Sequence, residues 1–434
     1  MGCASTPAAG LQTRSLLYLA AHGFPDGALP LGGGAAVCAQ LLREWARTQT
    51  FPVTLISPAI LGADAPSGSA LVGLGERQYA RFCRRFEAAA TAEVLRHDPA
   101  RVAVLVNDIS EGPDFRRLAA AGYDLVTIYH VDVVAYVAAI YGRNLVTPEA
   151  LVRWYERFPV GGMAKLVFAK QRDSLRYSRA VVVPSASMRE VLLGSYPATP
   201  PSKINVIPWG APDPGCESAA IGAEAAGLRR EYGIPEDALV LLTLSRISPE
   251  KGQDLLLRAL REWERLRDFP ERPLWLFICG DAAYMQGRRF MERLRSSAGR
   301  LRKTRAVFPG HVTGIRKQAF FALADLYVFP SRHESYGLTL VEALRAGLPA
   351  VSLDHHGARE VMRPDCGLLA PEERLREAIA SLLLDPDRRA RMGRAAREYG
   401  ATLRFSDSAA KLAGLLHPKR QQHVPRHAAQ GPVA

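Results

Sequence analysis

Short apolar runs of strand length alternate with longer segments of helical spacing along most of the chain. This alternation is typical of parallel sheets built from strand, helix, strand units. The strands we expect are 15–21, 52–57, 102–107, 124–130, 180–184 and 204–207 in the first half, and 239–245, 274–279, 306–308, 326–329 and 350–353 in the second. At 434 residues the chain exceeds what one hydrophobic core usually organises, so the sequence predicts an α/β protein of two doubly wound, Rossmann-like domains.

The boundary between the domains is expected at residues 208–215, because their sequence PWGAPDPG consists largely of turn formers. We predict a flexible start at 1–14, a first domain at 15–210 and a second domain at 211–399. Residues 417–434 have no apolar periodicity and are predicted to form a disordered basic tail.

The segment from Ala324 to Glu360 places two carboxylates around a glycine turn where a buried strand becomes a helix. Gly337 allows a sharp turn and close approach of a ligand to the backbone. The helix that begins there has unpaired amides and the positive end of its dipole at this point, which together suit a phosphate. Glu334 in the loop and Glu342 further along the helix could hold hydroxyl groups on either side. The layout predicts a site for a nucleotide diphosphate sugar.

Two basic residues, Arg246 and Lys251, follow the first strand of the second domain. Ligands of doubly wound sheets bind outside the carboxyl ends of the strands. Two fixed positive charges at this position could neutralise a departing diphosphate. A solvated loop with two chance basic residues is the alternative, and the position favours the phosphate role.

The first domain has a glycine loop at Gly32, Gly33 and Gly34, directly before an expected helix at 35–47. The loop suits close approach of a phosphate or an acceptor. A dinucleotide site is not expected, because the chain has no G-x-G-x-x-G here and no acid after the next strand. Polar residues that follow strands could line an acceptor site, with a polar turn as the alternative: Asn107, Asp108, Ser110 and Glu111.

The sequence HESYGLTLVEALRAGLPAV resembles the E-x7-E signature of family 4 retaining glycosyltransferases, which share the two-domain GT-B fold with a cleft between the domains. Arg246 and Lys251 in LSRISPEKG resemble the family's basic pair, and Gly280 in FICGD follows the next strand. VFPGHV resembles the base-binding loop, and Gly32 to Gly34 resemble the N-terminal glycine loop. The resemblance covers most of residues 15–400 and is stronger in the second half.

The resemblance implies roles for particular residues. His130, which ends the strand DLVTIYH, would contact the donor sugar together with Glu334, while Arg246 and Lys251 hold the leaving phosphate. Asp132 could orient His130 or bind the acceptor, and Asp108 and Glu111 could line the acceptor side. The implied donor-binding residues are Gly32, Gly33, Gly34, Gly280, Gly310, His311, Val312, Ser335, Tyr336, Gly337, Leu338 and Glu342.

The resemblance also implies that a helix at 400–416 crosses back to the first domain and that no metal or cofactor is obligatory. Two departures from the family pattern are the residues around His130 and the joint between domains, which has Trp209 and Gly210 where Asn-Gly is usual.

The implied activity is transfer of a sugar from a nucleotide diphosphate donor to a hydroxyl acceptor with retention of configuration, the leaving phosphate acting as base. The chain shows no pair of acids placed around an anomeric carbon as in hydrolases. Two alternatives stay open: a GT-B hydrolase or isomerase of a nucleotide sugar, and a non-catalytic nucleotide-sugar-binding protein.

The formal net charge of +13 suits nucleic acid, an anionic membrane or acidic small molecules. No nucleic-acid recognition motif is present, so we expect no such partner. The basic segment 153–189 could lie on an anionic membrane, although a solvated helix face packed on its own domain is favoured. Its basic residues include Lys165, Lys170, Arg172, Arg176 and Arg179. Oligomeric state is not indicated.

Six cysteines lie far apart, without the paired spacing of a zinc site or a disulfide framework. No apolar run approaches the roughly 20 residues that span a bilayer, and no signal peptide is evident. The start MGCAST fits a loose lipidation pattern, but Arg and Ala richness indicates a bacterial chain that would not use it. His355 and His356 favour a polar turn over a metal site. We therefore expect a cytoplasmic protein, with peripheral contact at the inner face of the membrane as an option.

Overall fold

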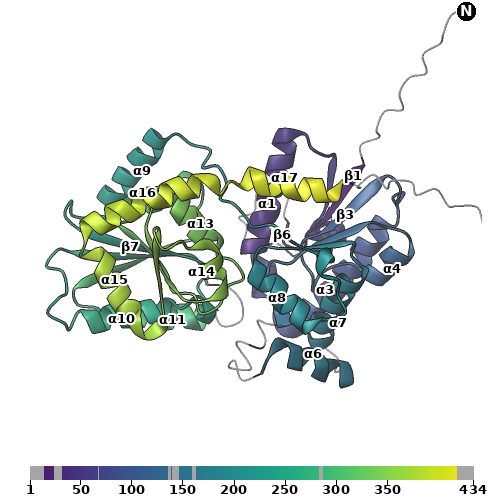
Figure 1. Cartoon of the computed structure of the whole chain (residues 1–434), viewed down its shortest axis with the longest axis horizontal. Coiled ribbons are helices and arrows are strands. Elements are labelled where there is room, and N and C mark those ends of the chain that lie inside the picture. Colours follow the sequence, from purple (N-terminus) through teal and green to yellow (C-terminus); the bar gives the residue numbers. More distant parts are fainter. Residues whose placement is uncertain are drawn as a thin grey trace, which may run out of the picture.

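The computed structural model describes residues 14–23, 32–66, 68–134, 138, 146–158, 163–282 and 287–417. It confirms the predicted α/β class, because each half of the chain folds around its own sheet (Figure 1). The first sheet has the order β2-β1-β3-β4-β5-β6 and the second the order β12-β11-β10-β7-β8-β9. All neighbouring strands are parallel, so each domain is doubly wound. The lipidation pattern, most of the predicted flexible start and all of the predicted tail after residue 417 lie outside the described residues.

The strands of the first sheet are β1 (Ser15–Leu19), β2 (Val53–Ile56), β3 (Val102–Val106), β4 (Leu125–Ile128), β5 (Ala180–Val183) and β6 (Ile204–Val206). The helices described in this domain are α1 (Gly33–Thr48), α2 (Gly68–Gly73), α3 (Glu76–Val94), α4 (Phe115–Ala120), α6 (Pro148–Arg157), α7 (Met163–Tyr177) and α8 (Ala186–Ser195).

The strands of the second sheet are β7 (Leu239–Leu244), β8 (Leu274–Cys279), β9 (Thr304–Gly310), β10 (Leu326–Phe329), β11 (Ala350–Leu353) and β12 (Gly367–Ala370). The helices described after β6 are α9 (Ser218–Tyr232), α10 (Gln253–Trp263), α11 (Gly287–Ala298), α12 (Gly314–Leu323), α13 (Leu338–Arg345), α14 (His356–Val361), α15 (Leu375–Leu383), α16 (Pro386–Thr402) and α17 (Phe405–Leu416).

The central strands are continuous apolar runs because helices cover both faces of each sheet. Every residue of β3, β4, β8 and β10 is buried. Each predicted strand is found, in most cases shortened by one to three residues at its ends. The strand β12 was not predicted. It is an edge strand of four residues, with two of them only partly covered, so its apolar signal is short and incomplete.

The chain passes between the domains twice, and the two passages touch. After β6, Ala211 pairs with Arg404, and the backbone N–H of Ala211 donates to the carbonyl oxygen of Leu403 at 2.8 Å. A Cβ atom on Gly210 would lie 2.2 Å from the carbonyl carbon of Arg404, so only glycine fits between the passages. Trp209 is buried and stacks on Phe405. The unusual pair Trp209 and Gly210 thus forms the packed joint.

The last helix lies on the first domain, although α16 before it belongs to the second. α17 contacts α1, and the indole N–H of Trp45 donates to the carbonyl oxygen of Ala409 at 3.3 Å (Figure 1). Arg179 donates to the carbonyl oxygen of Leu415 at 2.8 Å. Among the described residues, no helix combines the length and apolar character needed to cross a bilayer.

Candidate functional site

Candidate site residues, most of them predicted from the sequence, follow strands of both sheets. In the second domain, Arg246 follows β7, Gly280 follows β8, His311 follows β9 and Glu334 follows β10. In the first domain, His22 follows β1, Asn107 and Asp108 follow β3, His130 follows β4 and Ser185 follows β5. Because all strands in each sheet are parallel, each set gathers at one edge of its sheet.

Lys251 and Glu334 form an ion pair in the second domain. Lys251 ends the short 3-10 helix η3 (Pro249–Lys251), and its ammonium donates to Oε1 of Glu334. The same oxygen accepts from the hydroxyl of Ser331 at 3.2 Å. The two charged side chains are only 10% and 18% exposed. Burial raises the pKa of Glu334, but the Lys251 charge and hydrogen bond outweigh it, and the pKa stays below its ordinary value.

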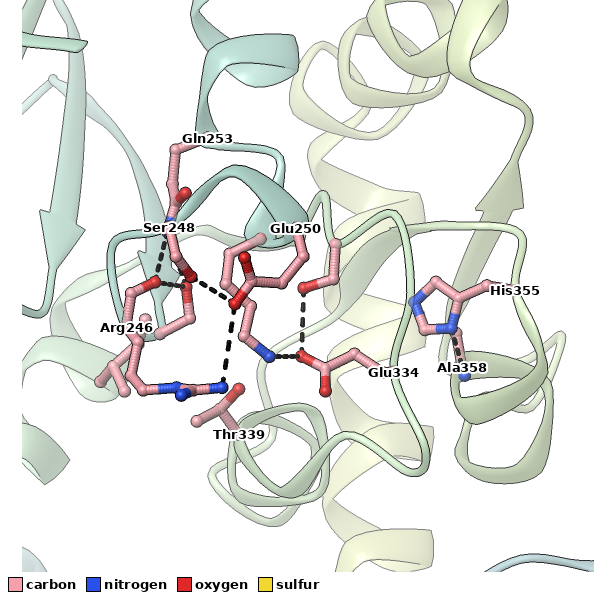
Figure 2. A network of polar contacts seen from close by, with 12 residues as sticks. Arg246, Ser248, Glu250, Gln253, Glu334, Thr339, His355 and Ala358 are labelled. Carbon is pink, nitrogen blue, oxygen red and sulfur yellow. Dashed lines mark hydrogen bonds and ion pairs between the residues drawn. The ribbon is translucent and has the colours of Figure 1, made fainter. Parts of the chain in front are cut away.

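Arg246 lies beside this pair, with its guanidinium 3.9 Å from Oε1 of Glu250 (Figure 2). The side-chain amide of Gln253 fixes the turn that carries Arg246, donating to the carbonyl oxygen of Arg246 at 2.8 Å. Gly280 approaches this turn closely, since a Cβ atom there would lie 1.8 Å from the carbonyl oxygen of Ser245. The two predicted cations are therefore held on rigid turns beside Glu334.

Helix α13 begins at Gly337, whose φ of 111° is in the region that favours glycine. Thr339 lies in the first turn of this helix, and its hydroxyl is 2.8 Å from the hydroxyl of Tyr327. Further along the helix, Glu342 accepts from Lys317 at 2.6 Å. Each acid of the predicted pair thus has a lysine partner in this structure, and these lysines supply positive charge around the helix start.

The predicted base-binding loop, residues 307–312, lies next to Gly280. Gly310 has a φ of 81°, and its carbonyl oxygen accepts from the backbone N–H of Gly280 at 2.8 Å. His311 is partly buried, and burial lowers the pKa of its imidazole below the ordinary value. Val312 is buried in the core and supports the loop.

The first-domain side of the site centres on His130. Its Nε2 lies 3.0 Å from Oδ1 of Asn107, which also accepts from the hydroxyl of Tyr18 at 2.7 Å. Burial lowers the pKa of His130 to about 4, against the opposing effect of Asp108. The ring is therefore neutral at pH 7 and donates from Nε2 to Asn107. Gly34 packs on this ring, because a Cβ atom there would lie 3.0 Å from Cδ2 of His130.

His22 was not predicted, yet it lies in this cluster. Its Nε2 is 3.5 Å from Oε1 of Glu111, and its backbone N–H donates to Asp108 at 3.3 Å. Burial lowers its pKa, but Asp108 and Glu111 outweigh burial and raise it to about 9. His22 is therefore a cation at neutral pH. The rule that selected His130, a histidine directly after a strand, would have found it.

The glycine loop of the first domain contacts the second domain. A Cβ atom on Gly33 would lie 3.4 Å from Cδ1 of Leu338, and one on Gly32 would lie 4.0 Å from Cδ of Arg246. The starts of α1 and α13 therefore meet across the domain interface, with Arg246 beside them. The loop containing Ser335 and buried Tyr336 also lies at this interface.

Three other residues singled out in the sequence are Asp132, His355 and His356. Asp132 is buried, and its Oδ1 accepts from the side-chain amide of Gln171 at 2.9 Å and from the backbone N–H of Val134 at 3.0 Å. His355 caps α14, because its Nδ1 accepts from the backbone N–H of Ala358 at 3.2 Å (Figure 2). His356 is exposed. No group of three or more potential metal ligands occurs among the described residues.

Two basic residues of the segment 153–189 bond to other parts of this chain. Lys170 is buried, donates to the carbonyl oxygens of Gly112 and Pro113, and lies 2.7 Å from Glu87. Arg179 pairs with Asp124 at 2.6 Å. The side chain of Lys165 falls outside the described residues.

The two doubly wound domains, with candidate site residues following strands of both sheets, define a protein with the two-domain GT-B fold. Residues 226–399 match the family described as "Glycosyl transferases group 1", which confirms the resemblance seen in the sequence for this part of the chain.

Among curated proteins, the GDP-mannose-dependent alpha-(1-6)-phosphatidylinositol monomannoside mannosyltransferase of Mycobacterium tuberculosis is 34% identical over 206 residues, which cover 45% of this chain and 51% of that protein. A D-inositol 3-phosphate glycosyltransferase of Geodermatophilus obscurus is 28% identical over 323 residues, or 72% of this chain and 65% of that protein. The chain thus spans between about half and two thirds of the length of these relatives.

Solved structures extend the likeness in fold to nearly the whole chain. Anabaena HepE, solved in complex with UDP and glucose, has a TM-score of 0.64 at 17% identity and covers 93% of this chain and 99% of its own. Sucrose-phosphate synthase of Thermosynechococcus elongatus has a TM-score of 0.67 at 18% identity and covers 93% of this chain and 98% of its own.

Proposed function

We propose that the protein is a retaining glycosyltransferase that moves a sugar from a nucleotide diphosphate donor to a hydroxyl acceptor. The observation that carries this proposal is the buried Lys251–Glu334 pair beside Arg246 and the start of α13. Two cations and a helix start suit a diphosphate, and a carboxylate next to them suits sugar hydroxyls.

In this proposal the charge that builds up on the departing diphosphate is stabilised by Arg246 and Lys251. Both are fixed before the reaction by the turn at Gln253 and by Glu334, so little reorganisation is needed. These cations supply the charge that a metal ion would otherwise provide, and we therefore propose transfer without an obligatory metal or other cofactor. The phosphate oxygen that leaves takes the acceptor proton on the same face of the sugar.

His130 enters the mechanism as a neutral residue. Burial keeps its ring uncharged at neutral pH, and Asn107 fixes the orientation of the ring. Its expected role is therefore to fix the donor sugar against Glu334. The first-domain side of the site also carries one cation, His22, and two carboxylates, Asp108 and Glu111. These groups suit an acceptor with several hydroxyl groups.

The relatives narrow the donor and acceptor to be tested first. One relative is named as dependent on GDP-mannose, and HepE was solved with UDP-glucose. Relatives named for phosphatidylinositol mannoside or inositol 3-phosphate make polyols and their phosphates the first acceptors to try. A cytoplasmic location with peripheral contact at an anionic membrane remains part of the proposal, supported by the net charge of +13.

The deciding experiment is a thermal-shift screen of the whole chain against UDP, GDP, ADP and dTDP sugars, followed by acceptor profiling of those that bind. We expect one nucleotide sugar to raise the melting temperature and to be consumed only when an acceptor is present. Release of free sugar without acceptor would indicate a hydrolase, and binding without turnover would indicate a non-catalytic sensor. Failure of every donor to bind at millimolar concentration would overturn the proposal.

A further inference from the structure

The first turn of α8, in the first domain, is bonded to two elements of the second domain. The hydroxyl of Ser185 donates to the carbonyl oxygen of Ser335 at 3.1 Å. Oε1 of Glu360, on α14, accepts from the backbone N–H of Ser187 at 2.9 Å and from its hydroxyl at 2.7 Å. Ser335 directly follows Glu334, so the first contact reaches the loop that carries the acid of the proposed sugar site.

The Ser185 hydroxyl makes two hydrogen bonds, one as acceptor and one as donor. It accepts from the backbone N–H of Met188 at 3.2 Å and so caps α8. Because the hydroxyl is the acceptor in that bond, its proton is available to Ser335. The cap of a first-domain helix and the position of a second-domain loop are therefore fixed by one side chain.

Helix α14 holds the same loop from the other side. A Cβ atom on Gly357 would lie 2.5 Å from the carbonyl oxygen of Glu334 and 2.8 Å from the backbone nitrogen of Tyr336. This contact leaves no room between the helix and the loop. Glu360, less than one turn further along α14, is the residue that binds Ser187, so α8, α14 and the loop form a closed set of contacts.

Glu360 binds α8 where a carboxylate is favoured. The first amides of a helix are unpaired and carry the positive end of the dipole, and a hydrogen bond to a carboxylate is stronger than one between neutral groups. Because its partners belong to different domains, this bond forms only when the domains lie in the present relation to each other.

We propose that Ser185, Ser187 and Glu360 are positioning residues through which the first domain fixes the loop that binds the donor sugar. This inference rests on the proposed function and adds that the donor sugar is held correctly only when α8 is seated on the second domain. The diphosphate itself is held by Arg246 and Lys251 within the second domain, so its binding does not need α8.

The test compares two ligands in each variant. Ser185→Asp can still cap α8 but cannot donate to Ser335, and Glu360→Ala removes the acceptor of Ser187. We expect both to weaken the nucleotide sugar found in the donor screen by roughly 3- to 10-fold, as for loss of one or two hydrogen bonds. Binding of the corresponding nucleoside diphosphate, measured by calorimetric titration, should change by less than about 2-fold.

Two controls separate positioning from folding. Ser185→Thr keeps the hydroxyl and should restore the wild-type ratio of the two affinities. Glu190→Gln changes an exposed acid on the same helix and should leave both affinities unaltered. A variant that unfolds would lose both ligands together. Equal loss of both ligands in a variant that unfolds at the wild-type temperature, or no loss of either, would overturn the positioning role. Failure of the wild-type chain to bind either ligand would overturn the proposed function instead.

Discussion

Substitution of Lys251 by Met tests the central electrostatic claim about the site. The change removes the ammonium but keeps an unbranched side chain, so Glu334 keeps its packing and loses its counter-charge. Both side chains are less than a fifth exposed, and removing one partner of a buried pair typically costs about 3–5 kcal/mol. With a urea m-value of about 3 kcal/mol per M, the low end of this range corresponds to a midpoint about 1 M lower.

The loss should depend on pH in a defined direction. In the wild type the pKa of Glu334 is below its ordinary value, so the stability from the pair is present above the unfolded pKa and is lost only as pH falls through the lower folded pKa. Without Lys251, only the weaker effects of His355 and Arg246 oppose the rise in the pKa of Glu334 that burial causes, and the penalty of a buried charge disappears as the acid takes up a proton. We expect the loss at about pH 7.5 to exceed the loss at about pH 5.

The assay is urea unfolding of the wild type and of Lys251→Met at both pH values, together with the double variant Lys251→Met, Glu334→Gln. The double variant carries neither charge, so at the higher pH it should be more stable than the single variant. A loss that is the same at both pH values, or a double variant no more stable than the single one, would refute the buried-pair reasoning.

Three further predictions concern other parts of the molecule. Gly210→Ala should lower stability by about 1–3 kcal/mol, because its Cβ meets the backbone of Arg404. Gly414→Ala, in an open part of α17, should be neutral or raise stability. Similar thermal unfolding of the two variants would contradict the packed joint. His22→Gln should lower the melting temperature at about pH 6 but have little effect at about pH 10, because the raised pKa of about 9 gives stability that is lost as pH rises through it; an equal effect at both pH values would exclude a charged His22. Arg246→Ala should lower kcat by about 10²–10³-fold while the donor still binds, and undiminished turnover in steady-state kinetics would remove Arg246 from the mechanism.

The sequence was sufficient for the fold, since strands and helices depend on local patterns, and it places the proposed second-domain site at the ends of strands. The strands are long apolar runs, and the site residues were found among the polar residues that come directly after each strand. The same rule was available for His22 but was applied only to the strand ending at His130. Asp132, close behind His130, is buried and accepts a hydrogen bond from Gln171, and its role at the site stays a prediction.

The pairings between side chains could not be predicted from the sequence. Glu334 and Lys251 are 83 residues apart, and Glu342 and Lys317 are 25 apart, so each pair depends on how strands are ordered in the sheet. Ser187 and Glu360 depend further on how one domain sits on the other. Edge strand β12 was missed for a different reason, because half of its residues are only partly covered.

The joint at Gly210 has a topological consequence. Because the chain leaves the first domain after β6 and returns to it as α17, the entire second domain is an insert between two neighbouring points of the first. Reporter groups placed on β1 and on α17 would therefore sit on the same domain and would not report any movement of the second domain relative to the first. A probe pair that follows this motion needs one member between residues 212 and 403.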